Sequence, residues 1–290
     1  MEVVSYVLLL INYSNITVMN KLVELRSEIN VMGILNVTPD SFSDGGRFAV
    51  PDSALKRVES MIEEGAAIID IGGESTRPGA ADVSAEQELE RVIPVLEGVK
   101  SRFDVLVSVD TSKAVVMSQA ISSGVDMIND VRALQEEGAL QACAASDVQV
   151  CLMHMLGQPR TMQKDPSYND VVESVCEFFK QKLSACEGEG ISMQRIWLDP
   201  GFGFGKALEH NITLLRRLNE LNRFQLPLLI GISRKSMIGA LLDERPVEGR
   251  LQGSVAAAVI SAMNGARLLR VHDVKATVDA LRIVKAVQEQ

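Results

Sequence analysis

The fold is decided by a repeated unit of sequence, and its clearest copy reads AIIDIGGE, residues 67–74. Four of its first five residues are apolar, and two glycines and a carboxylate follow at once. A short apolar run that ends in turn-forming residues predicts a strand buried on both faces, as in a parallel sheet. The polar break then marks the end of the strand and the beginning of a loop.

Runs of the same kind recur towards both ends of the chain, each followed by a polar or glycine-rich break. The runs occupy residues 31–37, 67–71, 105–109, 126–129, 148–153, 195–198, 228–232 and 267–271. Between them lie segments with helical spacing and helix-start signals. Ser84 and Gln87 are spaced as a capping box, and residues 208–221 have one charged face.

Strand and helix therefore alternate along the chain, which implies parallel strands joined by right-handed crossovers. Eight such units predict an α/β protein with a closed (β/α)8 TIM barrel in a single domain. A doubly wound open sheet is the alternative, because it has the same local pattern and differs only in closure.

The composition fits one large domain. The chain has 290 residues, of which 47% are hydrophobic and only 4% aromatic, so the core must consist mainly of Val, Ile, Leu, Ala and Met. No linker rich in proline and serine divides it. We expect residues 21–290 to form the barrel and residues 1–20 to be an N-terminal extension of unknown role.

Charge and cysteine usage limit the partners. The net charge of −9 and the lack of a block of Lys or Arg argue against nucleic acid, while a few positioned cations can still bind a small anionic substrate. The four cysteines form no CxxC pair, which argues against structural zinc and for reduced thiols. The apolar run at residues 7–11 is too short to span a membrane. We expect a cytoplasmic protein with no membrane partner.

Polar residues follow the apolar runs, and in a barrel the carboxyl ends of all strands line one mouth. In chain order these endings are Asn36, Asp70, Asp110, Asn129 with Asp130, His154, Asp199, Ser233 with Arg234 and Lys235, and Arg270 with His272. Any one of them is more often a turn or cap residue. Their convergence suits a flat heterocycle, whose paired N–H groups a carboxylate can accept.

The spacing of Arg270 and His272 adds an anion clamp to this prediction. The two are separated by one residue on a strand, so both point to one side. Glycine-rich loops at residues 38–46 and 72–80 are able to close over a substrate. The segment GFGFGK, residues 201–206, is no Walker A loop because Pro200 stands where its first glycine belongs, and it lacks the third glycine of a dinucleotide fingerprint.

Two longer motifs resemble the signatures of a known family, the dihydropteroate synthases. They are GILNVTPDSFSDGG, residues 33–46, and DIGGESTRPG, residues 70–79. Shorter matches are SVDT 108–111, IND 128–130, HM 154–155, QPRTM 158–162, LDPGFGF 198–204, SRK 233–235 and RVH 270–272. The resemblance covers about residues 30–290. The departures, Leu156 and Ile232, remove no functional group.

The resemblance implies an activity. Members of this family are transferases of folate biosynthesis, which condense 6-hydroxymethyl-7,8-dihydropterin pyrophosphate with p-aminobenzoate to give 7,8-dihydropteroate and pyrophosphate. It further implies Mg²⁺ as the cofactor, sulfonamides as inhibitors that mimic p-aminobenzoate, and a homodimer.

The resemblance also assigns roles to residues. The pterin would be bound by Asp110, Asn129, Met153, Asp199, Gly231 and Lys235. The p-aminobenzoate would be bound by Phe42, Thr76, Arg77, Pro78, Phe204 and Ser236. The pyrophosphate would be bound by Asn36, Thr76, Arg270 and His272, with Asn36 also carrying the Mg²⁺. The catalytic groups would be Asp44, Asp110, Asp199, Lys235 and Arg270, while Asp70 and His154 would be supporting groups.

The chemistry agrees with these roles, because loss of pyrophosphate leaves a pterin methylene cation that needs stabilisation and a departing anion that needs counter-charges. No covalent nucleophile is required. Two other functions remain open at this point, namely a methyltransferase that uses methyltetrahydrofolate on a similar barrel, and a pterin-binding barrel without catalysis.

Overall fold

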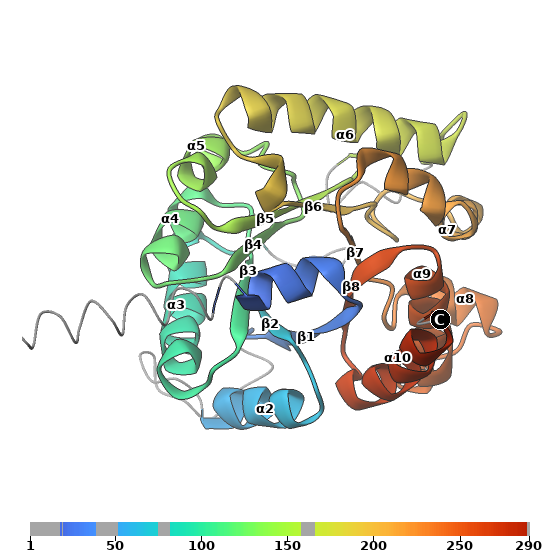
Figure 1. The fold of residues 1–290 in the computed structure, drawn as a ribbon, viewed down its shortest axis with the longest axis horizontal. Coiled ribbons are helices and arrows are strands. Elements are labelled where there is room, and N and C mark those ends of the chain that lie inside the picture. Colours follow the sequence, from blue (N-terminus) through green and yellow to red (C-terminus); the bar gives the residue numbers. More distant parts are fainter. Residues whose placement is uncertain (1–17, 19, 39–51, 75–81, 158–165, 289–290) are drawn as a thin grey trace, which may run out of the picture.

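The structure is a computed structural model and describes residues 18, 20–38, 52–74, 82–157 and 166–288. Eight parallel strands form a closed barrel in which each strand pairs with its neighbours in sequence and β8 pairs with β1 (Figure 1). The strands are β1 (Asn30–Asn36), β2 (Ile68–Gly72), β3 (Leu106–Asp110), β4 (Met127–Asp130), β5 (Gln149–Met153), β6 (Ile196–Asp199), β7 (Leu228–Ile230) and β8 (Ala266–Val271). The predicted TIM barrel is confirmed, and the open sheet is excluded.

Helices surround the barrel and connect its strands (Figure 1). They are α2 (Asp52–Glu63), α3 (Ala85–Arg102), α4 (Ala114–Ser122), α5 (Ala139–Ala144), α6 (Val171–Gly188), α7 (Leu208–Arg216), α8 (Ser236–Leu241), α9 (Leu251–Met263) and α10 (Val274–Gln288), with 3₁₀ turns η1 (Met193–Arg195), η2 (Leu218–Phe224) and η3 (Val247–Gly249). Within the described ranges, no helix is long and apolar enough to cross a membrane.

Two predictions about helices can be compared with the structure. The capping box at α3 is confirmed, since Gln87 N donates to Ser84 Oγ over 3.3 Å and Ser84 N donates to Gln87 Oε1 over 3.1 Å. The helical spacing of residues 208–221 corresponds to two helical elements, because α7 ends where Arg217 leaves helical geometry (φ −106°, ψ 20°) and the chain continues as η2.

The barrel interior is filled by side chains at the end where the strands begin. One side chain from each strand contributes, and all of them are buried: Met32, Ile68, Leu106, Met127, Cys151, Trp197, Leu229 and Leu268. A larger apolar layer lies between the sheet and the surrounding helices. The interior is therefore a packed core and no channel, so the chemistry must lie at the other end of the strands.

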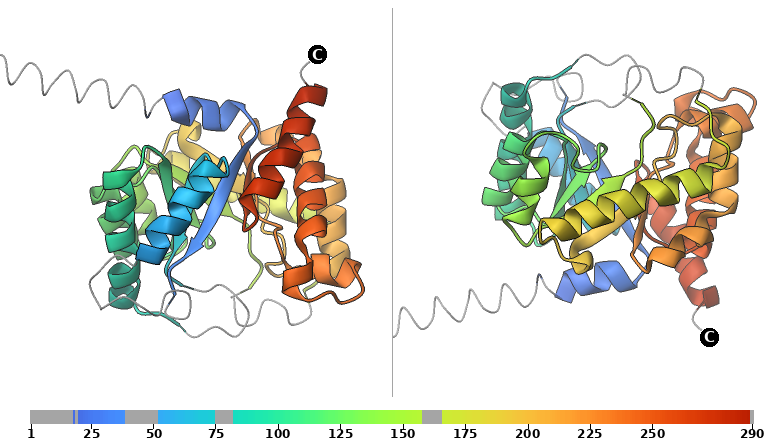
Figure 2. Two further views of the ribbon diagram at one scale, coloured as in Figure 1. Left: turned by 90° about the horizontal axis from the view of Figure 1, so that it is seen from below. Right: turned by 90° about the horizontal axis from the view of Figure 1, so that it is seen from above.

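The helix of residues 20–27 closes the packed end of the barrel, across which it lies in Figures 1 and 2. Leu25 is 1% exposed and belongs to the interior cluster. The guanidinium of Arg26 lies 5.4 Å from the centre of the Trp197 ring and donates to Gln149 Oε1 (3.0 Å) and to the carbonyl of Ile196 (3.1 Å). Val18 also packs against the interior cluster, so described residues on both sides of the expected boundary at residue 20 belong to the packed barrel.

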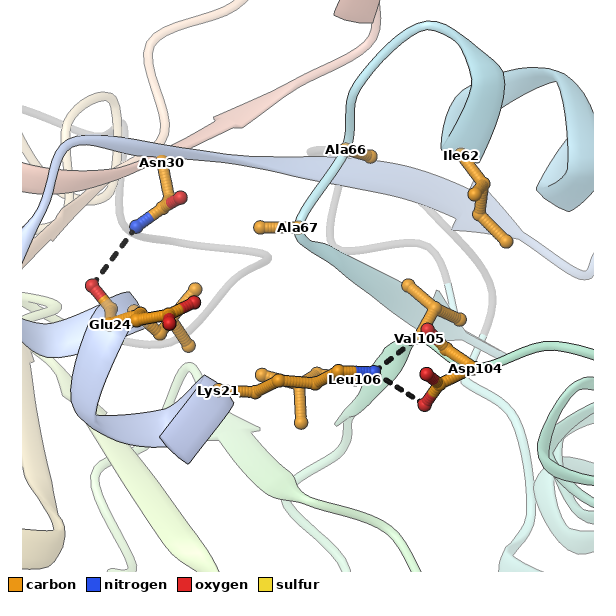
Figure 3. Close-up of a pocket in the computed structure, with 10 residues that line it drawn as sticks. Lys21, Glu24, Asn30, Ile62, Ala66, Ala67, Asp104, Val105 and Leu106 are labelled. Carbon is orange, nitrogen blue, oxygen red and sulfur yellow. Dashed lines mark hydrogen bonds and ion pairs between the residues drawn. The ribbon is translucent and has the colours of Figure 1, made fainter. Parts of the chain in front are cut away.

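A pocket of about 230 Å³ opens beside this helix, at the beginning of β2 and β3 (Figure 3). Lys21 crosses its rim and forms an ion pair with Asp104, and Asn30 donates to the carbonyl of Glu24. Because this pocket lies at the end of the barrel opposite the strand carboxyl ends, it is separate from the site predicted from the sequence.

Replacing Arg26 by alanine is expected to lower the free energy of unfolding by about 2 kcal/mol, because two charge-assisted hydrogen bonds and a cation–π contact are lost. Trp197 is the only tryptophan, so urea unfolding followed by its fluorescence measures this change. Val23→Ala is the matched control, since Val23 lies on the same helix with 61% exposure. Equal stability of the two variants would show that Arg26 does not hold the helix in place.

The four cysteines are free and buried, at Cys143, Cys151, Cys176 and Cys186. Cys151 lies inside the barrel, and the others lie in the layer between sheet and helices. Burial raises the pKa of the Cys143 thiol to about 12 and that of Cys186 to about 11. These thiols are therefore small apolar core groups, as expected from the sequence.

Candidate active site

The polar strand endings meet at one mouth of the barrel. Sheet register aligns Gly72 with Asp110 and Asp110 with Asn129, and, on the next two strands of the barrel, Met153 with Asp199. Gly231 follows β7, and the side chain of Arg270 lies against it. The structure therefore brings together the described residues that the resemblance assigned to the pterin.

The centre of this mouth is a network of charged groups around Arg270. Its Nε donates to Asp70 Oδ2 over 2.6 Å, and its Nη2 donates to Asp110 Oδ2 over 2.8 Å. Asn129 Nδ2 donates to the same oxygen of Asp70 over 3.3 Å. Asp70 is fully buried, and its second oxygen, Oδ1, accepts no hydrogen bond from any residue that the structure describes. Asp70 thus connects Arg270, which is predicted to bind the pyrophosphate, to Asn129, which is predicted to bind the pterin.

Burial and the paired charges act in opposite directions on these groups. Burial raises the pKa of Asp110 to about 7, against the attraction of Arg270, and the neighbouring Asp70 carboxylate raises it further. Burial alone would lower the pKa of Arg270, but the carboxylates of Asp70 and Asp110 raise it above its ordinary value. Arg270 therefore stays cationic and balances the carboxylates.

A second ionic group lies across the mouth at Asp199 and Lys235. Asp199 Oδ1 accepts from Gly201 N over 2.7 Å, and burial raises the pKa of Asp199 although Lys235 opposes the shift. Lys235 Nζ donates to the carbonyl of Phe202 over 2.5 Å and lies 4.3 Å from the centre of the Phe204 ring. Burial lowers the pKa of Lys235 to about 8, and the Asp199 carboxylate limits the shift. The pair offers both an acceptor and a donor to a flat ligand.

Lys235 is placed by the turn that precedes α8. Arg234 has φ +59°, in the left-handed region, and its guanidinium makes two bonds to Asp273, of 2.8 and 2.5 Å. Ser233 Oγ lies 3.1 Å from His272 Nδ1 and accepts from His272 N over 3.2 Å. These contacts join the ends of β7 and β8, so they fix Lys235 and His272 relative to each other.

Lys206 was absent from the sequence-based site, yet it is 2% exposed beside the mouth. Its Nζ lies 2.9 Å from His154 Nδ1 and donates to the carbonyls of Gly201 (2.8 Å) and Phe204 (3.1 Å). Burial lowers the pKa of His154 to about 2, and Lys206 adds to the effect, so this imidazole is neutral. The only sequence signal was the GFGFGK segment, in which the lysine suggested a phosphate loop.

A further group missed from the sequence lies where β2 leads into its loop. Lys113 Nζ contacts Glu74 Oε2 and Glu88 Oε2, each at 2.5 Å, and Arg91 donates to the carbonyl of Gly73 over 2.8 Å. Glu88 is fully buried although it lies on a helix. This cluster fixes the beginning of the loop that carries the second family motif.

The mouth role expected for Asp130 is wrong. Its carboxylate accepts from Ser112 Oγ (2.5 Å) and from the backbone N–H groups of Arg132 (2.8 Å) and Leu134 (2.7 Å). Successive strand residues point to opposite faces, so only one of Asn129 and Asp130 can face the interior. Asn129 does so, and Asp130 stabilises the turn outside.

The remaining predicted residues divide into two sets. Asn36 and Ser236 are exposed at the mouth, and Phe204, 8% exposed, packs in a cluster with Met153. The others lie outside the described residues, namely Phe42, Asp44, Thr76, Arg77 and Pro78.

The comparisons with known proteins agree with this geometry. Residues 32–272 match the family described as pterin binding enzyme. The dihydropteroate synthase of Escherichia coli K12 is 57% identical over 260 residues, which are 90% of this chain and 92% of that protein. That of Haemophilus influenzae is 54% identical over 267 residues, with 92% and 96% covered.

Solved structures give the same result. The Yersinia pestis dihydropteroate synthase in complex with a sulfonamide drug has a TM-score of 0.86 and 55% identity, covering 91% of this chain and 96% of that one. The Xanthomonas albilineans dihydropteroate synthase with 4-aminobenzoic acid has a TM-score of 0.84 and 49% identity, covering 90% and 94%.

A closed barrel that presents Asp, Asn, Lys and Arg groups at one mouth, together with the family match, defines the class: the chain belongs to the pterin-binding enzymes. Within that class it is one of the dihydropteroate synthases, which are transferases. The comparisons thus favour this family over the two other functions left open by the sequence, a methyltransferase and a barrel without catalysis.

Proposed function

We propose that the described mouth residues bind the dihydropterin pyrophosphate and promote loss of its pyrophosphate before p-aminobenzoate attacks the methylene carbon. The observation that carries this proposal is the ion pair of Arg270 with Asp110, together with Asp199 and Lys235, which influence each other electrostatically at the same mouth. Asp199 accepts the amidine-like edge of the pterin and Lys235 donates to its ring acceptors. Asp110 and Asn129 complete the polar contacts to the pterin, and Met153 and Gly231 line the sides of its binding site.

The carboxylates are also proposed to stabilise the transition state. When pyrophosphate leaves, positive charge develops on the methylene and spreads into the ring, and nearby buried carboxylates stabilise it because little water screens them. Asp110 and Asp199 do this from fixed positions, so no reorganisation is needed at the moment of reaction. Asp44 is proposed as a third such group.

The pyrophosphate is proposed to lie against Arg270 and His272. Arg270 has a 20% exposed side chain and contacts two carboxylates, so its remaining N–H groups are available to an anion at the mouth. His272 stands two residues on, joined to Ser233. Thr76 is proposed to add a hydroxyl contact to the same anion.

Mg²⁺ is proposed to arrive with the pyrophosphate and to contact Asn36. Across the described part of the chain, no group of three or more His, Cys, Asp or Glu is arranged to hold a metal. A single exposed amide oxygen, beside Gly72, fits Mg²⁺, which keeps most of its waters and binds mainly through substrate phosphates. When bound, the ion would neutralise charge on the leaving pyrophosphate.

The p-aminobenzoate is proposed to bind beside the Phe204 ring and Ser236, with Phe42, Thr76, Arg77 and Pro78 completing its pocket. The Xanthomonas relative was solved with 4-aminobenzoic acid and the Yersinia relative with a sulfonamide drug. On this basis, sulfonamides are expected to compete with p-aminobenzoate for the chain described here.

A homodimer and a cytoplasmic location complete the proposal. Apolar side chains are exposed on the adjacent helices α9 and α10, at Ile260, Met263, Ile283 and Val287. Exposed apolar groups on neighbouring helices suit a subunit interface. The free, buried thiols suit a reducing compartment.

Steady-state pyrophosphate release from the dihydropterin substrate and p-aminobenzoate tests the function. We expect turnover with Mg²⁺ and a rate at least about 100-fold lower after chelation by EDTA, because the leaving anion loses its counter-charge. Asn36→Ala is expected to raise the Mg²⁺ concentration that gives half the maximal rate. No release with Mg²⁺ would contradict the proposed reaction, and an unchanged Mg²⁺ requirement in Asn36→Ala would contradict the metal contact alone.

A further inference from the structure

The buried ammonium of Lys206 joins two neighbouring strand-end loops. Its three acceptors within 3.1 Å are His154 Nδ1, which follows β5, and the carbonyls of Gly201 and Phe204, which follow β6. The two loops also pack directly on each other, because a Cβ on Gly201 would lie 1.9 Å from the His154 carbonyl oxygen. Lys206 therefore lies inside a seam between β5 and β6.

The geometry is that of a fully satisfied ammonium group. An ammonium has three N–H donors and no acceptor, and each donor here has a partner. His154 Nδ1 can accept only if it carries no proton, which places the imidazole proton on Nε2. Burial lowers the pKa of Lys206 to about 7, and Asp199 opposes the shift while Lys235 adds to it.

The loop held by Lys206 supports the groups of the p-aminobenzoate side of the mouth. Its Phe202 carbonyl accepts from Lys235 Nζ over 2.5 Å, and its Phe204 ring lies 4.3 Å from that same nitrogen. Asp199 and Lys235 have anchors of their own, the strand β6 and the Arg234–Asp273 ion pair. The carbonyl of Phe204 is bound by Lys206 directly, so this residue depends most on it.

We propose that Lys206 is a positioning residue for p-aminobenzoate: it fixes the loop of residues 200–207 against the end of β5 and thereby sets the place of the Phe204 ring beside Lys235. The inference rests on the proposed binding of p-aminobenzoate at Phe204. It assigns to Lys206 no contact with the reacting atoms.

The test compares the KM for p-aminobenzoate with the KM for the dihydropterin substrate in Lys206→Met. This substitution keeps the side-chain volume and removes the charge. We expect the KM for p-aminobenzoate to rise about ten-fold or more and the KM for the dihydropterin substrate to change less than about three-fold. Arg26→Ala is the stability control, since it destabilises the far end of the barrel and leaves both constants unchanged. Unchanged constants in Lys206→Met, or an equal rise in both, would overturn the inference.

Two further variants keep the result decisive. Lys206→Gln retains two N–H donors without the charge. We expect its KM for p-aminobenzoate to rise more than its KM for the dihydropterin substrate, though by less than in Lys206→Met. If Lys206→Met does not fold, the ratio of these two changes in Lys206→Gln tests the inference. In Phe204→Leu the KM for p-aminobenzoate is expected to rise as well. An unchanged value in Phe204→Leu would overturn the proposed binding place and the inference with it, whereas a change there and none in Lys206→Met would overturn the inference alone.

Discussion

Replacing Lys235 by alanine is expected to lower kcat by about 10²–10³-fold, because a fixed donor is lost in a buried site where charge develops. The side chain donates to the Phe202 carbonyl, and its charge favours the ionised form of Asp199, so its removal also takes a counter-charge from that carboxylate. Pyrophosphate release under saturating substrates measures the effect, and circular dichroism checks that the variant is folded. A rate near that of the wild type would contradict the role of Lys235.

The pH dependence gives an independent measure of the same group. The pKa of Lys235 is about 8, lowered from its ordinary value by burial, so the ammonium is lost as pH rises through that value. The kcat/KM of the wild type is therefore expected to fall above about pH 8. In Lys235→Arg the guanidinium stays charged, and the fall should move to higher pH. A fall that stays in place would assign it to another group.

Arg270→Ala is expected to have the second large effect, on both turnover and stability. The substitution leaves the fully buried Asp70 and the neighbouring Asp110 without the cation between them. Removing one partner of a buried ion pair costs about 3–5 kcal/mol, because the remaining charge is uncompensated. Loss of the anion contact is expected to slow turnover by about 10²-fold or more. Urea unfolding and pyrophosphate release measure the two effects separately.

A second substitution separates these contributions. In Arg270→Ala combined with Asp70→Asn, the buried charge is removed as well, so most of the stability should return while turnover stays low. If stability does not return, the cost of the single variant does not arise from the charge on Asp70. If turnover returns with stability, Arg270 has no direct part in the reaction.

The sequence predicted the strands well because each buried strand is encoded locally. Runs such as residues 67–71 and 148–153 are apolar and end in polar residues, and the observed strands β2 and β5 agree with them to within one residue. The capping box at Ser84 was also predictable, since both partners lie within three residues of each other. Alternation of such local signals was enough for the barrel.

The supporting groups of the site could not be predicted in the same way. Lys206 bonds to His154, 52 residues before it, and Arg270 bonds to Asp70, 200 residues before it. Nothing in the spacing of these residues shows that a long side chain folds back into a seam or across the barrel. Asp130 failed for a related reason, because the phase of a strand decides which of two adjacent polar residues faces the interior.

The burial of all four cysteines has a practical consequence for studies in solution. Thiol reagents attack the thiolate, and groups that are shielded from solvent with strongly raised pKa values react slowly. The native cysteines are therefore expected to give little background labelling by maleimides. A single cysteine introduced at an exposed position, such as Ser236 at the mouth, would take a fluorophore selectively without removal of any native thiol.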